Sequence, residues 1–469
     1  MKKRKGGRDI GQTNSKDKNH KTPSPINLPA EILLIIFNFA YEQCRAPISS
    51  TSPNHTTQWL NTDPLSLSFF PHSIASVSSF WRDVMYMEPK FWTRFVVFVG
   101  RTALDDAQAY LDWTKDQPEP LDIFIISKCN GEISPLHERS LVESCMQLLS
   151  PHFHQCRTIR ISVTLRSSLP RLDHHFCDSA PDLTDLRIDC EINNAVPDSW
   201  PNDIAEWSFS SKGLRKLHLD SIYIREAWLR GSSWLRGLCL RKLTISSGSP
   251  SDGKHSTSDQ TMLSHIQAVT RGPGLYHPSF LTIKGVSIKY EDPLGLPAHG
   301  ITLTLDGMTQ SSVMKIINAY QPLYLRLCNL APSFDFSIFM GPNIYHCNRT
   351  HSIATHNNCL SFTDEGIIWK FHYQLRYLTI IDCAKVTPTV LKSLVDNVYQ
   401  TRDGATSKQR MRGWPSERHV NPLHTLMVVG GAQICAADQR WFESRVLNFD
   451  WQATTGKHKP SKYIDSVGE

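Results

Sequence analysis

Nine segments of this chain repeat one short pattern in which leucine or isoleucine alternates with other residues. The full form is Leu-x-x-Leu-x-Ile/Leu, as in Leu214-Arg215-Lys216-Leu217-His218-Leu219. An apolar residue at every second position is typical of a strand with one buried face. Because one such strand cannot bury that face alone, its recurrence predicts an array of neighbouring strands. The segments are residues 159–161, 183–188, 214–219, 240–245, 280–283, 301–305, 323–327, 375–380 and 423–428.

The copies are unevenly spaced, about 22 to about 50 residues apart, which predicts long loops between some of the strands. We expect residues 331–359 to be one of these loops. Ahead of the array, residues 94–99 and 121–126 are expected to be strands, and residues 102–115 and 136–149 amphipathic helices. The sequence therefore predicts an α/β fold.

Residues 26–95 form a different kind of segment, with more apolar residues than so small a unit can bury. Pro29 suits an early helical position, and apolar residues follow it on nearly all sides of the predicted helix. Such a helix is either buried all round or binds a partner. We expect a second helix over residues 73–84 and a last aromatic turn over residues 89–95. The apolar residues expected on one face of the first helix are Ile32, Leu33, Ile36 and Phe37.

The order of these motifs resembles an F-box: Leu-Pro-x-Glu-Ile-(x)3-Ile-Phe from Leu28, Val-x-x-x-Trp-Arg-x-Val from Val77, and Pro-x-Phe-Trp from Pro89. The resemblance implies a three-helix fold that binds the Skp-type adaptor of a cullin–RING ubiquitin ligase. Residues 44–72 are a long insertion where the simplest family members have a short link. The alternative is a helical hairpin that packs on the following domain. The residues implied to contact the adaptor, or to support those contacts, are Leu28, Pro29, Ile32, Leu33, Ile36, Phe37, Val77, Trp81, Val84 and Trp92.

The repeated strands resemble leucine-rich repeats, although their spacing is irregular for that family. This resemblance implies a solenoid with a parallel sheet along its concave side. Side chains between the apolar strand positions would face that side and form a mixed polar, somewhat basic surface for a client protein. The candidate client-binding residues are Arg187, Lys216, His218, Lys242, Thr244, Thr304, Arg326 and Thr379.

The net charge of +6 comes from the N-terminal segment. Residues 1–22 hold eight of the 50 basic residues and two of the 44 acidic ones, so the other residues are neutral overall. Nucleic acid is therefore not an expected partner. We expect this tail to be disordered, and Lys2-Lys3-Arg4-Lys5 to be either a nuclear localisation signal or simply solvated.

Other classes of protein find little support in the sequence. No run of about 18 apolar residues occurs, so no membrane span is expected, and no apolar segment of a secretory signal follows the basic start. The 12 cysteines lie singly with no C-x-x-C motif, which favours reduced thiols in the cytoplasm, the nucleus or both. Motifs of hydrolases, P-loop proteins, zinc proteases and dinucleotide-binding proteins are absent. The residues around His346-Cys347 do not fit a zinc spacing. We therefore expect no catalytic residue, cofactor or metal.

These observations predict four regions: a basic tail over residues 1–24, an F-box-like domain over 25–96, a repeat domain over 97–450 and a C-terminal tail over 451–469. The expected function is substrate recognition in a Skp–cullin–F-box ubiquitin ligase, without catalysis by this chain. The adaptor would bind the N-terminal helices, and an unidentified client protein would bind the repeats. The alternative is a repeat scaffold or a nuclear binding protein that acts outside a ubiquitin ligase.

Overall fold

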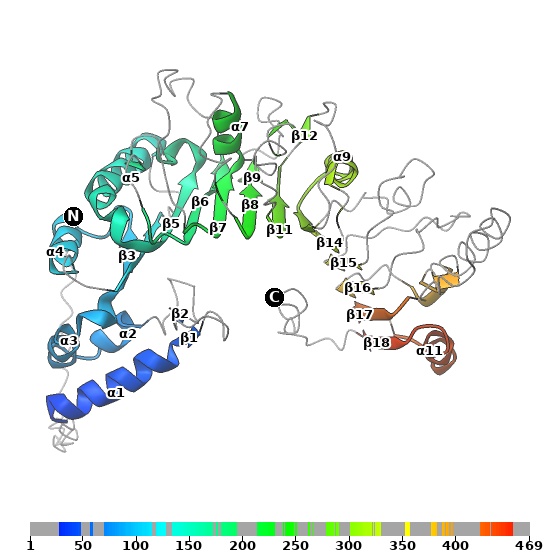
Figure 1. Cartoon of the computed structure of the whole chain (residues 1–469), viewed down its shortest axis with the longest axis horizontal. Helices are drawn as coiled ribbons and strands as arrows, with labels where there is room; N and C mark the ends of the chain where they lie inside the picture. Colours follow the sequence, from blue (N-terminus) through cyan, green and yellow to red (C-terminus); the bar gives the residue numbers. More distant parts are fainter. Residues whose placement is uncertain are drawn as a thin grey trace, which may run out of the picture. The chain divides into compact units, whose positions relative to one another are not determined.

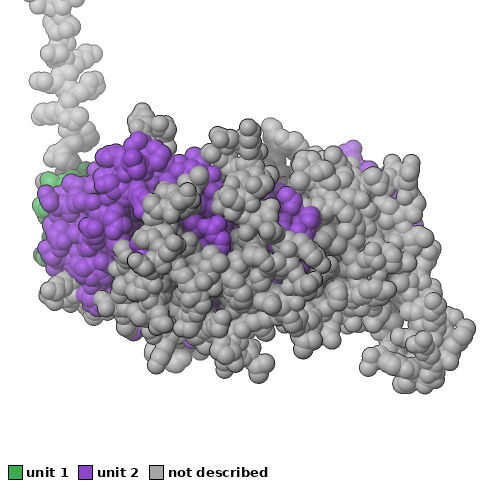
Figure 2. Space-filling view, turned by 90° about the horizontal axis from the view of Figure 1, so that it is seen from above, with its two compact units in different colours: residues 1–91 green, residues 92–469 purple. Residues whose placement is uncertain are grey.

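The computed structural model of the chain (Figure 1) divides into two compact units, residues 1–91 and residues 92–469, which Figure 2 shows in different colours. The boundary lies a few residues before the expected one, because the strand that starts at Arg94 pairs within the second unit. The expected basic tail lies outside the described residues. The structure describes residues 28–47, 57–59, 70–114, 119–127, 134–171, 175–176, 180–194, 213–229, 238, 240–247, 249–250, 261–262, 266, 278–286, 288–289, 301–320, 322, 324–329, 352–356, 377–381, 387–389, 391–393, 395–396, 423–431 and 433–453.

The first unit is built mainly from helices. Pro29 is the N-cap of α1, with an extended backbone (φ −54°, ψ 148°), and its carbonyl accepts the first hydrogen bonds of the helix. A short antiparallel pair, β1 with β2, lies within the expected insertion. The elements are α1 (Ala30–Gln43), β1 (Arg45–Pro47), β2 (Thr57–Trp59), α2 (His72–Ala75), α3 (Ser79–Tyr86) and η1 (Pro89–Trp92), a 3-10 turn that crosses into the second unit.

The expectation of one helix over residues 73–84 was wrong. The chain leaves helical geometry at Ser78, whose backbone is extended and whose hydroxyl accepts a hydrogen bond from the backbone N–H of Trp81. This is an N-cap arrangement, which favours the start of a new helix over the continuation of the old one. The segment therefore forms two helices, α2 and α3.

Aromatic side chains fill the core of the first unit. Leu33, Phe37 and Tyr41 lie on one side of α1 at a spacing of four residues, and all three are buried. The Tyr41 ring lies 5.7 Å from Phe70 and 5.4 Å from Phe91, while the Phe37 ring lies 5.3 Å from Trp81. Packing of α1 thus buries one stripe of an apolar helix and leaves the other side uncovered by this unit.

The second unit contains a sheet of 14 strands, all paired in parallel, which confirms the α/β class with a parallel sheet. Sheet order follows sequence order from β3 to β18, except that β9 pairs beside the main path and that β10 and β12 form a separate parallel pair. The strands are β3 (Arg94–Phe98), β4 (Leu121–Ile126), β5 (Cys156–Leu165), β6 (Asp185–Asn193), β7 (Lys216–Asp220), β8 (Lys242–Ser246), β9 (Ser249–Pro250), β10 (Thr261–Met262), β11 (Phe280–Lys284), β12 (Ile288–Lys289), β13 (Thr302–Asp306), β14 (Tyr324–Cys328), β15 (Ser352–His356), β16 (Tyr377–Ile381), β17 (Thr425–Gly431) and β18 (Asn448–Ala453).

Helices follow several of the strands, and α5, α7 and α9 lie on the same face of the sheet (Figure 1). In α5 the Ser134 hydroxyl caps the N-terminus, and Pro135 occupies the first helical position. The helices and 3-10 turns of this unit are α4 (Leu104–Thr114), α5 (Pro135–Leu149), η2 (Ser150–Gln155), η3 (Arg166–Ser168), α7 (Ser221–Leu229), α9 (Gln310–Tyr320) and α11 (Ala436–Glu443).

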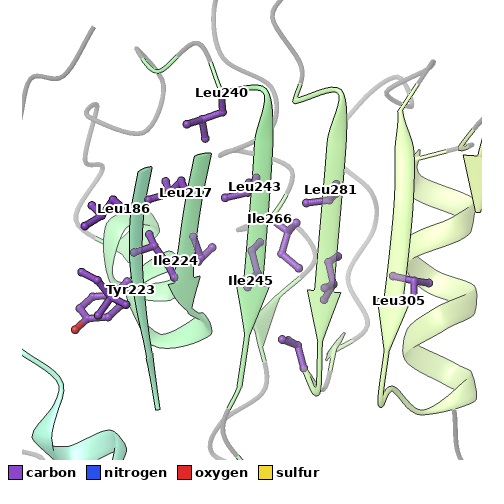
Figure 3. Packing of buried hydrophobic residues seen from close by; sticks show 14 of the residues in the cluster. Leu186, Leu217, Tyr223, Ile224, Leu240, Leu243, Ile245, Ile266, Leu281 and Leu305 are labelled. Carbon is purple, nitrogen blue, oxygen red and sulfur yellow. The ribbon is translucent and has the colours of Figure 1, made fainter. Parts of the chain in front are cut away.

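The apolar strand positions stack into ladders that form the core. Leu217, Leu243, Leu281, Leu303 and Leu325 are successive partners across five strands, and each is at most 2% exposed. Figure 3 shows several of these side chains on neighbouring strands. The in-register pairing is what a repeated Leu-x-Leu pattern needs in order to bury every copy.

A further regularity marks the turns that leave these strands. Gly285, Gly307 and Asn329 directly follow β11, β13 and β14, and all three have positive φ, of 63°, 62° and 47°. Gly285 donates its backbone N–H to Asp306, and Gly307 donates its own to Cys328. The three turns therefore share one geometry, which glycine and asparagine adopt most easily.

Two expectations about the later strands were wrong. Residues 331–359 are not entirely loop, because β15 lies within them and pairs with β14 and β16. The sheet also does not end at residue 450, because β18 continues to Ala453. Residues 454–469 lie outside the described residues.

Candidate functional site

The residues between the buried ladder positions, most of them polar, belong to the face of the sheet opposite the core. Their registers form continuous rows across the strands. One row runs through Arg160, Arg187, His218, Thr244, Thr282, Thr304, Arg326, Ala354 and Thr379. A second row runs through Asp185, Lys216, Lys242, Phe280, Thr302, Tyr324, Ser352 and Tyr377. All the residues that the sequence predicts for the client-binding surface lie in these two rows.

Four side chains of this polar face meet at β6, β7 and β8. The Arg187 guanidinium donates to Asp189 at 2.8 Å from Nε. The His218 ring contacts the Ser246 hydroxyl at 2.9 Å and lies 4.0 Å from the Asp189 carboxylate. Burial opposes ionisation of Asp189, but the charge of Arg187 and the hydrogen bond from its guanidinium help to outweigh it and hold the pKa of that carboxyl below its usual value.

The electrostatic surroundings of His218 are unfavourable for a proton. Burial, the positive charge of Arg187 and those of Arg160 and Lys284 together lower the pKa of His218 to about 4, although Asp189 acts in the opposite direction. His218 is therefore neutral at pH 7. Burial makes the largest contribution to this low pKa, and the neighbouring cations add to it.

Serine, histidine and aspartate are the residues of a catalytic triad, but their arrangement here is different. Ser246 and Asp189 both approach the same ring nitrogen of His218, Nε2. In a triad the carboxylate bonds Nδ1 and leaves Nε2 to the serine. Asp189 is instead a partner of Arg187, so this cluster has the geometry of a polar surface network.

Aromatic side chains line the same face nearer the C-terminus. Tyr324 and Tyr377 are 48% and 38% exposed, and one strand, β15, lies between them in register. The Tyr377 ring lies 5.4 Å from His424. Exposed tyrosines are common anchors in protein interfaces, so this part of the face adds apolar contact area to the polar rows.

A second candidate surface lies on α1 of the first unit. Ile32, Ile35, Ile36 and Phe39 are 43%, 65%, 44% and 67% exposed. At 100° per residue they fall on one continuous stripe beside the buried one. Four large apolar residues together on one exposed helix face are unusual for a surface without a partner. Exposed Val77, Phe80 and Met87 add further apolar surface around α3.

The ten residues expected to serve the adaptor divide into two groups. Leu33, Phe37 and Val84 are buried in the first unit, where they support α1 and α3. Trp92 is buried in the second unit, where its ring contacts Tyr110 and Trp113. Those in the other group retain exposed surface: Leu28, Pro29, Ile32, Ile36, Val77 and Trp81.

Sequence reasoning missed Ile35 and Phe39 as candidate contacts. It placed Ile32, Leu33, Ile36 and Phe37 on one face, whereas Leu33 and Phe37 are buried and Ile32 and Ile36 are exposed. Because α1 is apolar on nearly all sides, periodicity alone does not select the inward stripe. The signal that would have found Phe39 is its spacing of seven residues from Ile32.

Other kinds of site find no support within the described residues. There, histidines, cysteines and carboxylates do not gather in groups of three or more that could hold a metal ion. His346-Cys347 lies outside the described residues. No helix in the described part of the chain combines the length and hydropathy needed to span a bilayer.

Comparisons of the chain with protein-family models, with curated proteins and with solved structures found no match.

Proposed function

We propose that this protein is the substrate-recognition subunit of a Skp–cullin–F-box ubiquitin ligase. The first unit would be an F-box that binds the Skp-type adaptor, and the second a leucine-rich-repeat solenoid that holds a client protein. Catalysis would belong to other subunits, and this chain would raise the effective concentration of the client near the ubiquitin donor.

The observation that carries the proposal is the exposed apolar stripe of α1, which consists of Ile32, Ile35, Ile36 and Phe39. Its burial by an adaptor would remove this surface from water and supply affinity. The motif order of the first unit supports the same partner. Since α1 also packs through Leu33 and Phe37, the stripe is presented by a helix that is already held in place.

The repeat assignment has separate support. The parallel strands in sequence order, the in-register leucine ladders and the repeated positive-φ turns at Gly285, Gly307 and Asn329 are all properties of a stacked repeat. The rows of polar residues on the opposite face then supply a broad surface for a client.

The test is co-purification of a Skp-type adaptor with the full chain carrying Ile35→Asp and Phe39→Asp. Both side chains are more than 60% exposed, so the first unit should keep its fold while the apolar stripe is interrupted. We expect the intact chain to retain the adaptor and the double variant to lose it. Leu136→Asp, on α5 and 80% exposed, is the matched control and should retain it.

Equal retention of the adaptor by the intact chain and the double variant would reject this docking surface. Absence of any adaptor with the intact chain would reject the F-box assignment. Co-purification of a cullin together with the adaptor distinguishes a ligase subunit from a scaffold that acts outside the ligase.

A further inference from the structure

Basic side chains crowd together on the polar face of the sheet at β5 to β8. Lys216 and Lys242 are direct register partners on neighbouring strands, and both are exposed. Arg160 and Arg187 are register partners in the adjacent row. Like charges placed directly opposite each other destabilise a sheet, so the fold maintains this arrangement at a cost.

Two further arginines extend the cluster at the N-terminal ends of the strands. Arg215 and Arg241 directly precede Lys216 and Lys242, and both are exposed. The backbone N–H of Arg241 donates to the carbonyl of Arg215 at 2.8 Å, which holds the two residues side by side. We call these six residues the basic patch: Arg160, Arg187, Arg215, Lys216, Arg241 and Lys242.

Carboxylates lie close to two residues of the basic patch, Arg187 and Lys216. Asp189 pairs with Arg187, and Asp185 lies 4.0 Å from Lys216, at the limit of an ion pair. Among the described residues, no carboxylate lies within ion-pair distance of Lys242. Asp220 adds no surface charge, because it is fully buried and pairs with Arg166 at 2.9 Å.

The charges of these basic residues act on a histidine inside the cluster. Burial and the neighbouring cations lower the pKa of His218, which lies next to Arg187 in register. Burial is the largest cause of this shift, and the charges of Arg187 and Arg160, two of these basic residues, add to it.

We propose that the basic patch binds an acidic, extended peptide segment of the client, running across β6, β7 and β8 over Lys216 and Lys242. Neighbouring strands lie about 4.8 Å apart, so these three strands span about 10 Å, or about three residues of extended chain. Anionic side chains along such a segment would pair with the exposed lysines and relieve their mutual repulsion. This deepens the proposed function, since the segment belongs to the client, but the binding itself needs no adaptor.

The test uses the full chain and three fluorescently labelled probes of equal length: hexaglutamate, a serine peptide with two phosphoserines, and single-stranded DNA. The variants are Lys216→Glu with Lys242→Glu, and the neutral pair Lys216→Gln with Lys242→Gln. The control pair, Arg101→Glu with Arg440→Glu, changes exposed residues of the second unit outside the basic patch and the two rows, and alters net charge as much as the Lys→Glu pair does. The basic N-terminal tail is the same in every variant.

We expect the Glu pair to weaken peptide binding about tenfold or more and the Gln pair to weaken it less, while the control pair changes it less than twofold. Preference for the phosphoserine probe over hexaglutamate would identify phosphate as the bound anion, and the reverse would identify carboxylate. Either result supports the patch.

An equal loss of peptide binding in the Lys216→Glu, Lys242→Glu variant and in the control variant would overturn the proposal, because net charge alone would then explain binding. No loss in the patch pair, or tighter patch-dependent binding of the DNA probe than of either peptide, would also overturn it. Adaptor co-purification is measured on the same variants. If the adaptor fails to bind the intact chain while the patch still selects acidic peptides, the proposed function fails and this inference stands.

Discussion

At the scale of single residues, His218 gives the clearest prediction of pH dependence. Its pKa is lowered from 6.5 to about 4 by burial and by Arg187. Between these pH values the unfolded chain binds more protons at this residue than the folded chain does. The contribution of neutral His218 to the free energy of unfolding is therefore present above about pH 6.5 and is lost as the pH decreases toward 4. We expect this group to remove about 2 kcal/mol of stability by pH 4.5.

His218→Gln keeps a polar side chain that can reach Ser246 but removes the titration. Urea unfolding of the intact chain and the variant at pH 7.0 and 4.5, followed by hydrogen exchange in β6 to β8, measures the difference. The variant should lose less stability on acidification than the intact chain. Identical losses would show that His218 does not keep the low pKa that its surroundings impose.

At the scale of elements, the Trp441 side chain connects α11 to the segment that contains Lys392 and Asp396, through contacts with two cations. We call this arrangement the clamp. Lys392 and Arg445 lie 5.4 Å and 4.2 Å from the Trp441 ring, and their charges pair with Asp438 and Asp396. Each cation–π contact at an exposed site contributes about 0.5–1 kcal/mol. We expect Trp441→Leu to weaken the packing of α11 by about 1–2 kcal/mol, measured as faster amide exchange in residues 433–453.

Trp441→Phe is the matched control for this clamp, because it keeps an aromatic face for both cations. Its rate of amide exchange in residues 433–453 should lie between those of Trp441→Leu and the intact chain. If the Phe and Leu variants exchange equally fast, packing volume rather than the cation–π contacts holds the helix.

The elements also show how far sequence reasoning reaches. Strands with two or three large apolar residues at alternate positions, such as β7 and β13, were predicted within about two residues of their observed ends. β15 was missed because Ser352-Ile353-Ala354-Thr355-His356 has one large apolar residue, and its pairing with β14 and β16 provides the rest. Likewise, the alternation of apolar and other residues along each strand predicted which residues lie on the polar face. The contact between His218 and Ser246 could not be predicted in this way, because it depends on tertiary structure.

At the scale of the whole molecule, the two compact units bury separate cores, which predicts that they unfold separately. Phe37 is 1% exposed among the rings of the first unit, while Leu243 is fully buried between ladder neighbours of the second. Replacing a buried Phe or Leu by Ala costs about 2–5 kcal/mol through lost burial and the cavity left behind. Phe37→Ala should therefore speed amide exchange in residues 28–47 and 70–91 and leave β6 to β14 protected.

Leu243→Ala is the reciprocal variant. Parallel strands of a stacked array share their core with the strands on either side, so its effect should spread from β8 into β7 and β11 and leave α1 unchanged. Hydrogen exchange of the full chain, read separately over the two units, tests both variants in one experiment. Loss of protection throughout the chain in either variant would mean that the units unfold together, and that adaptor docking on α1 and client binding on the sheet depend on one shared fold.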